Sequence, residues 1–162
     1  MSLVLVRVDN RLIHGQVLEA WLPHVQADIV VVVDDGIAND SFRKQLMLAV
    51  VPKTVRVDVY SHEQFEAVTH SLFSGDSKGL VLFATPADAL KAYRGGFHFS
   101  TLNLGNMHVG PQKCCISQTL YVDCADLDDL EQLTELGVEI CAQCIPTDRK
   151  LHWDCHCKEL RA

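Results

Sequence analysis

The stretch that decides the fold is LVLVRVDNRLIHGQVLEAWL, residues 3–22. Its first part, residues 3–8, is rich in leucine and valine, which is typical of a buried strand. From Val17 to Leu22 the apolar residues recur at helical spacing. The pattern therefore predicts a buried strand and then a helix, with a polar turn between them.

The same order of strand and helix recurs along the chain. Apolar runs rich in β-branched residues predict strands, and amphipathic stretches between most of them predict helices. The predicted strands are 3–8, 28–34, 55–60, 79–84, 100–104, 119–123 and 138–142, and the predicted helices are 16–25, 38–50, 62–73, 86–94 and 125–136. Between residues 107 and 118 neither pattern continues, which predicts a long loop. This alternation predicts a doubly wound α/β fold, with a mainly parallel sheet of about seven strands and helices on both faces.

Length and composition predict one domain over residues 1–162, in which residues 150–162 form an atypical tail rich in cysteine and histidine. No apolar run approaches the roughly 20 residues that cross a bilayer, and no signal peptide is recognisable, so we expect a cytoplasmic protein. The formal net charge is -7, and basic residues do not cluster. Nucleic acid is therefore not an expected partner.

The chain contains seven cysteines, an odd number that argues against a disulfide framework in a cytosolic protein. We expect Cys114, Cys115 and Cys124 to be small core residues. A second group could in principle bind zinc: Cys141, Cys144, His152, Cys155, His156 and Cys157. The C-x-C spacing at its end is atypical of structural zinc, so the sequence predicts no metal site, and metal binding stays open as a weaker hypothesis.

His14 lies in the predicted turn between the first strand and the first helix. A helix start offers unpaired backbone N–H groups and the positive end of a dipole, and Arg11 adds a fixed positive charge. These features suit a phosphoryl group on an imidazole nitrogen, although a histidine in such a turn can simply cap the helix. We expect Asp9 to orient Arg11 or an imidazole N–H, or else to be a turn residue. We expect Arg7 to be exposed or at a partner surface.

The carboxyl ends of parallel strands meet at one edge of a sheet, where ligands usually bind. The loops at these ends are 9–15, 34–37, 84–86 and 105–112. They contain the candidates Asp9, Arg11, His14, Asp34, Asp35, Thr85, Asn106, His108 and Gln112. Backbone N–H groups around Gly15 and the hydroxyl of Thr85 could bind phosphate. His108 is a candidate to approach His14, although a histidine in a loop is more often a surface residue.

Neither a P-loop string nor the dinucleotide fingerprint G-x-G-x-x-G occurs in the chain. The sequence therefore offers no support for a nucleotide-dependent kinase or dehydrogenase. We expect no cofactor, and a phosphoryl donor that is itself a protein fits better than ATP.

The string RLIHGQV at residues 11–17, with Asp9 and Trp21, resembles a known signature. It is the signature of the IIB component of the mannose/fructose/sorbose family of the bacterial phosphoenolpyruvate:sugar phosphotransferase system. Similar family segments are residues 31–38, 43–47, 82–86 and 102–107, and the resemblance runs from about residue 3 to about residue 148. One departure is Gly105-Asn106, where the family usually has two glycines before the methionine.

The resemblance implies that His14 accepts a phosphoryl group from a phosphohistidine of the IIA protein. The group then passes to a hexose of the mannose, fructose or sorbose class as the sugar enters through membrane IIC and IID partners. The residues predicted to carry this phosphotransferase chemistry are His14, Arg11 and Asp9, with Gly15 and Thr85 binding phosphate. An alternative with the same histidine is a regulatory phospho-acceptor that signals the state of the phosphotransferase system. A homo-oligomer stays open.

Overall fold

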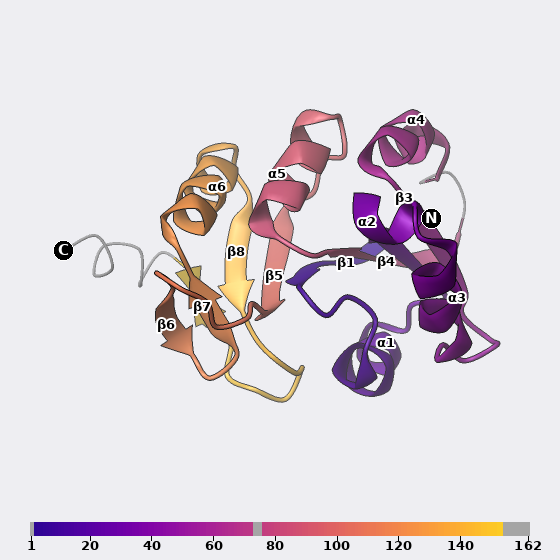
Figure 1. Cartoon of the computed structure of the whole chain (residues 1–162), viewed down its shortest axis with the longest axis horizontal. Helices are drawn as coiled ribbons and strands as arrows, with labels where there is room; N and C mark the ends of the chain where they lie inside the picture. Colours follow the sequence, from indigo (N-terminus) through magenta and orange to yellow (C-terminus); the bar gives the residue numbers. More distant parts are fainter. Residues whose placement is uncertain (1, 73–75, 154–162) are drawn as a thin grey trace.

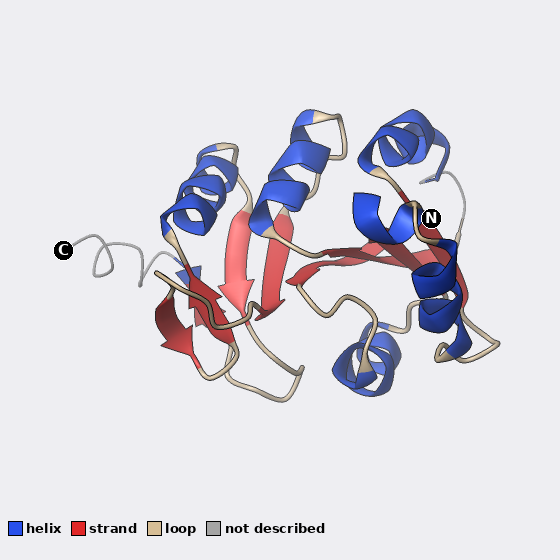
Figure 2. Cartoon of the chain, in the orientation of Figure 1, coloured by secondary structure: helices blue, strands red, loops and turns tan. Residues whose placement is uncertain are grey.

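The computed structural model describes residues 2–72 and 76–153, which form a sheet of seven strands with helices on both faces (Figures 1 and 2). The strand order in this sheet is β3-β2-β4-β1-β5-β8-β9, and only β9 pairs antiparallel to its neighbour. The strands are β1 (Ser2–Asp9), β2 (Ile29–Val33), β3 (Arg56–Tyr60), β4 (Lys78–Phe83), β5 (Thr101–Asn106), β8 (Glu139–Ala142) and β9 (Leu151–His152). The predicted doubly wound, mainly parallel fold is confirmed.

The helices divide between the two faces of the sheet (Figure 1). They are η1 (Gln16–Trp21), a short π-helix that continues into α1 (Leu22–Val25), then α2 (Asp35–Ala38), α3 (Ser41–Ala49), α4 (His62–Leu72), α5 (Pro86–Arg94) and α6 (Cys124–Glu135). Side chains of α4, α5 and α6 pack into one apolar cluster, and those of η1, α1, α2 and α3 pack into the other. Within the described ranges, no helix has the length and apolar character needed to cross a membrane.

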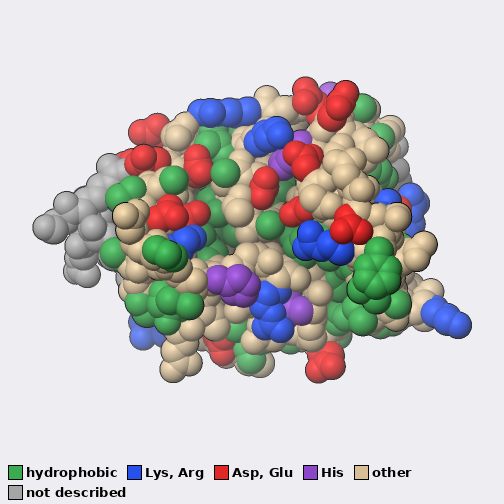
Figure 3. Space-filling view, in the orientation of Figure 1, with side chains coloured by type: hydrophobic (Ala, Val, Ile, Leu, Met, Phe, Trp, Pro, Cys, Tyr) green, Lys and Arg blue, Asp and Glu red, His purple; other side chains and the backbone are tan. Residues whose placement is uncertain are grey.

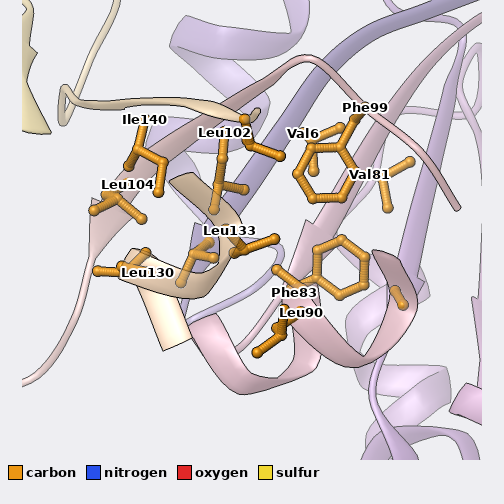
Figure 4. Packing of buried hydrophobic residues seen from close by; sticks show 14 of the residues in the cluster. Val6, Val81, Phe83, Leu90, Phe99, Leu102, Leu104, Leu130, Leu133 and Ile140 are labelled. Atoms are coloured by element: carbon orange, nitrogen blue, oxygen red, sulfur yellow. The ribbon is translucent and has the colours of Figure 1, made fainter. Parts of the chain in front are cut away.

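The run of four valines in β2 shows why the strand sequences are apolar without interruption. Val31 and Val33 belong to the cluster under α4, α5 and α6, whereas Val30 and Val32 belong to the cluster under η1 and α1. All four side chains are fully buried, because successive residues of a strand point to opposite faces and both faces are covered. Figure 4 shows the first cluster at close range.

Three sequence predictions about the elements were wrong. Residues 119–123 do not join the main sheet, because Leu120–Val122 (β7) pairs with Cys114–Ser117 (β6) in a separate hairpin. The predicted loop 107–118 is also not a loop throughout, since it contains β6. The seventh strand of the sheet is β9 instead. The predicted helix 38–50 is divided into α2 and α3, because the Asp40 side chain caps a new helix by accepting hydrogen bonds from two backbone N–H groups.

The cysteines near the hairpin also differ from the prediction. Cys114, Cys115 and Cys124 are exposed rather than buried in the core. Cys114 and Cys115 lie in the separate two-stranded hairpin rather than in the covered main sheet, and Cys124 is the first residue of α6. Cys141 is buried in β8. The predicted cysteines and histidine at 155–157 lie outside the described residues.

Trp153 follows β9 directly and is 3% exposed within the cluster under α4, α5 and α6. We therefore expect Trp153→Ala to lower the free energy of unfolding by about 3–5 kcal/mol, since the substitution leaves a large cavity. Urea unfolding measures the change. The matched control is Val109→Ala, at a side chain that is 73% exposed, which should change stability by less than about 0.5 kcal/mol. A loss below about 1 kcal/mol for Trp153→Ala would show that the tryptophan does not anchor this end of the chain.

Candidate active site

The loop of His14 leaves the sheet where the connections change face. β1 is followed by η1 and α1 on one face, whereas its neighbour β4 is followed by α5 on the other face. Such a change produces a crevice at the carboxyl ends of the strands. Residues 10–15 therefore lie at the topological switch point that the sequence pattern predicted for the ligand chemistry (Figure 1).

The His14 imidazole is held by Asp9. Nε2 of His14 lies 2.9 Å from Oδ2 of Asp9, and the two side chains are 8% and 0% exposed. A carboxylate accepts a hydrogen bond, so Nε2 carries the proton and donates it. In the neutral ring Nδ1 therefore keeps its lone pair; this atom is buried and has no hydrogen-bond partner within the described ranges. The predicted contact of Asp9 with an imidazole N–H is present.

Asp9 receives hydrogen bonds from several directions. Oδ2 also accepts from Nε and Nη2 of Arg7, at 3.2 and 2.9 Å, and from Nδ2 of Asn106 at 3.1 Å. Oδ1 accepts from the backbone N–H of Arg11 at 3.2 Å. Burial alone would raise the pKa of the Asp9 carboxyl, but the hydrogen bond from His14, the charge of Arg7 and the amide of Asn106 outweigh it and hold this pKa below its usual value. Asp9 is therefore ionised at neutral pH.

Arg7 is fully buried, and the prediction that it is exposed or at a partner surface was wrong. Besides Asp9, its guanidinium donates to Oδ1 of Asn103 and to the carbonyl oxygens of Gln143 and Cys144, at 2.9 and 3.0 Å. Burial lowers the pKa of Arg7 and the charge of Asp9 raises it, and an arginine remains protonated in proteins.

The Arg7 guanidinium packs between the Trp21 ring and the backbone at Gly105. The Trp21 ring lies below it, with 5.1 Å between the guanidinium carbon and the ring centroid, and Nε1 of Trp21 donates to the Cys144 carbonyl at 2.8 Å. A Cβ atom at Gly105 would lie 1.9 Å from Nη2 of Arg7, so only glycine fits at this position. The charge of Arg7 is thus held in place beside Asp9.

Arg11 and Gly15 flank His14 at the surface. Arg11 is exposed, and among the described residues its guanidinium has no hydrogen-bond or ion-pair partner, so the fork is free to bind an anion. Gly15 is also exposed, with φ of −50° and no atom within 4 Å of a would-be Cβ, so backbone geometry does not require a glycine there. Figure 3 shows histidine and basic side chains together in the region between the end of β1 and α1.

The structure does not bring all predicted residues to His14. The Thr85 hydroxyl caps α5, where it donates to Oδ2 of Asp88 at 2.6 Å and accepts from the Asp88 backbone N–H at 3.2 Å. Asp34 caps α2 by accepting from the Ile37 N–H. His108 is exposed and, in the part of the chain that the structure describes, shares no hydrogen bond with His14.

Three residues take part in the site although they were not among the predicted site residues: Arg7, Asn103 and Gln16. A usable signal for Arg7 was present, because Arg7 and Asp9 are two residues apart in a strand and therefore point to the same face. A charged residue inside an otherwise apolar central strand needs a buried partner, and Asp9 is that partner. The contacts of Asn103 and Gln16 come from distant segments and carry no local signal.

Metal ligands do not gather in the site. Over residues 2–72 and 76–153, no group of three or more His, Cys, Asp or Glu side chains is arranged to hold a metal ion.

Comparisons with known proteins identify the family. A model described as the PTS system sorbose subfamily IIB component matches residues 3–161, which extends past residue 148, where the motifs of the sequence end. The chain is 32% identical over 148 residues to the fructose-specific EIIB component of the phosphotransferase system of Bacillus subtilis, covering 91% of each chain. It is 34% identical over 151 residues to the N-acetylgalactosamine-specific IIB component 1 of Escherichia coli, covering 92% of this chain and 94% of the relative.

Solved structures agree with this assignment. The IIB domain of the sorbose permease from Klebsiella pneumoniae superimposes with a TM-score of 0.90 at 30% identity, covering 100% of this chain and 99% of that one. The sequence and the fold comparisons therefore indicate the same family. The chain belongs to the sorbose subfamily of IIB components of the phosphotransferase system, whose members are phosphotransferases that act in sugar uptake.

Proposed function

We propose that His14 is the phosphoryl carrier of this IIB component and that Nδ1 is the accepting atom. The observation that carries the proposal is the pairing of Nε2 with Asp9, which in the neutral ring leaves the lone pair on Nδ1, an atom without a hydrogen-bond partner among the described residues. A neutral imidazole nitrogen is a good nucleophile near pH 7.

The reaction exchanges one N–P bond for another. The donor is a phosphohistidine of a IIA protein, and its N–P bond breaks as the bond to Nδ1 of His14 forms. The phosphorylated ring gains positive character, and the proton on Nε2 stays in its hydrogen bond with the ionised Asp9. In the second step the bond to Nδ1 breaks and the phosphoryl group joins a sugar hydroxyl, whose proton is released.

We assign to Arg11 the role of neutralising the negative charge on the phosphoryl oxygens. Its exposed guanidinium has no partner among the described residues, and the planar fork matches phosphate oxygens. The transition state of phosphoryl transfer is loose, so positioning and neutralisation of these oxygens dominate catalysis. The backbone N–H of Gly15 is assigned to the same oxygens. The prediction that Thr85 binds phosphate stays a prediction, with its hydroxyl engaged by Asp88.

The partners follow from the family. An E. coli relative, the mannose-specific EIIAB component, is 30% identical over 151 residues, which make up 47% of its length. We propose a cytoplasmic protein that takes its phosphoryl group from a IIA protein. It delivers the group to a hexose of the mannose, fructose or sorbose class at membrane IIC and IID partners, with no cofactor.

The test is phosphorylation from phosphoenolpyruvate through the general phosphotransferase proteins and a IIA protein. We expect one phosphoryl group per chain, mapped to His14 under alkaline conditions that preserve phosphohistidine. Delivery to sugar in vesicles that contain IIC and IID distinguishes a transport component from the regulatory phospho-acceptor. Absence of label in folded protein would contradict the proposal.

We expect Arg11→Lys to keep the charge but slow phosphoryl acceptance about fifty- to hundred-fold, because the ammonium cannot bind two oxygens at once. This corresponds to a loss of about 2–3 kcal/mol at the transition state. Rapid-quench kinetics with phosphorylated IIA measure the rate. The control is Arg43→Lys, at an arginine in α3, which should leave the rate unchanged. An unchanged rate for Arg11→Lys would place Arg11 outside the chemistry.

A further inference from the structure

Asn106 lies at the end of β5 and is 8% exposed. Its position is fixed by the backbone, because Asp9 of β1 is its register partner and its carbonyl oxygen accepts from the Asn10 N–H at 3.0 Å. Its amide nitrogen lies 3.1 Å from Oδ2 of Asp9 and 3.0 Å from Oε1 of Gln16. Both N–H groups of the amide are therefore used.

The two acceptors lie on either side of His14 in the chain. Asp9 ends β1 before the loop, and Gln16 is the first residue of η1 after it. Asn106 thus joins the two ends of the segment that carries the histidine. A glycine, which the family resemblance leads one to expect at this position, could make neither contact.

The contact with Asp9 bears on the histidine because the same oxygen serves both. Oδ2 of Asp9 accepts from Nε2 of His14 at 2.9 Å and from the amide of Asn106 at 3.1 Å. Each donor that binds a carboxylate oxygen withdraws part of its charge, so the other donors are held less strongly. With the amide present, Asp9 is a weaker acceptor for the imidazole N–H.

We propose that Asn106 is a positioning residue that, through Asp9, weakens the hold on the Nε2 proton and so makes phosphorylated His14 a better donor. The inference rests on the proposed function of His14. Asp9 stabilises the positive character of the phosphorylated ring, and the amide reduces that stabilisation. Among the described residues the Asn106 amide donates to Asp9 and Gln16 and shares no hydrogen bond with Nδ1 of His14, so its effect on the histidine passes through Asp9.

The test compares Asn106→Leu, which keeps the branched shape but has no donors, and Asn106→Gly, which removes the side chain. We expect both to shift the phosphoryl exchange equilibrium with IIA toward phosphorylated His14 by about three- to tenfold, and to slow hydrolysis of the phosphohistidine by a similar factor. The matched control is Thr119→Val. Its hydroxyl donates to the Gly105 carbonyl at the same end of β5 but does not contact Asp9, so the equilibrium should stay unchanged.

A spectroscopic measurement on unphosphorylated protein separates this proposal from the proposed function. In Asn106→Leu and Asn106→Gly, the Nε2 proton of His14 should move downfield in the NMR spectrum, because its bond to Asp9 becomes stronger. If the protein takes no phosphoryl group but this shift occurs, the proposed function fails and the positioning contact stands. If folded variants change neither the equilibrium nor the resonance, or change them only as Thr119→Val does, the role of Asn106 is overturned.

Discussion

Replacing His14 by glutamine should abolish phosphoryl acceptance and leave the fold intact. Glutamine has no nucleophilic nitrogen, since the lone pair of an amide nitrogen is delocalised into the carbonyl group. Its N–H can still reach toward Asp9, whose Oδ2 lies 2.9 Å from Nε2 in the native protein. The measurement is transfer of label from phosphoenolpyruvate through the general proteins and IIA, with circular dichroism and urea unfolding to confirm the fold.

The control for this experiment is His108→Gln. His108 is exposed on the loop after β5, and it shares no hydrogen bond with His14 among the described residues. We expect this variant to take up label as the native protein does. Full labelling of His14→Gln, or loss of label in His108→Gln, would show that the carrier histidine has been assigned wrongly.

The sequence predicts the elements whose apolar pattern is long and uninterrupted. The valine run of β2 and the amphipathic stretch of α5 can be predicted without knowing what packs against them. A continuous apolar run indicates a strand buried on both faces, and apolar residues at helical spacing indicate a helix buried on one face. β6 and β9 have four and two residues, too short for a period to show. Their existence depends on a pairing partner that only the folded chain supplies.

The site divides in a similar way. Asp9 and His14 are five residues apart, and a strand followed by a tight turn brings them together. A contact of Asp9 with an imidazole N–H was therefore one of the roles that the sequence offered, beside orienting Arg11 or forming a turn. Arg7 is different, because its partners besides Asp9 lie 96 to 137 residues away, at Asn103, Gln143 and Cys144. The spacing of Arg7 and Asp9 in an apolar strand was a local signal for a buried pair, but the partners that complete the hydrogen bonds of the guanidinium could not be found from nearby sequence.

The second large effect should come from Arg7→Met, which we expect to lower the free energy of unfolding by about 3–5 kcal/mol. Methionine fills a similar volume, but it leaves the buried charge of Asp9 without the arginine as its ion-pair partner, and the carbonyl oxygens of Gln143 and Cys144 without this donor. Urea unfolding at neutral pH measures the loss. It should exceed that of Arg7→Lys, which keeps one positive charge.

The matched control is a second arginine and aspartate with the same spacing in a strand. Arg56 and Asp58 of β3 form an ion pair at 2.8 Å, but their side chains are 63% and 18% exposed. Because water screens such a pair, Arg56→Met should cost no more than about 1 kcal/mol. If Arg7→Met and Arg56→Met lowered the free energy of unfolding equally, burial would not be what makes the Arg7–Asp9 pair more stabilising than the Arg56–Asp58 pair.

The acid side of the stability curve provides an independent check on the same pair. The folded-state pKa of Asp9 is lowered, so its contribution to stability is present above the ordinary carboxyl pKa of about 3.9 and is lost as pH falls toward the folded-state value. Removing the charge of Arg7 should raise the folded-state pKa of Asp9 and so reduce the difference between its pKa in the unfolded and folded states. The stability lost in Arg7→Met should therefore be largest near neutral pH and shrink as pH falls below about 4. A loss independent of pH from 7 to 3 would assign the effect to packing of the side chain rather than to the charge of Asp9.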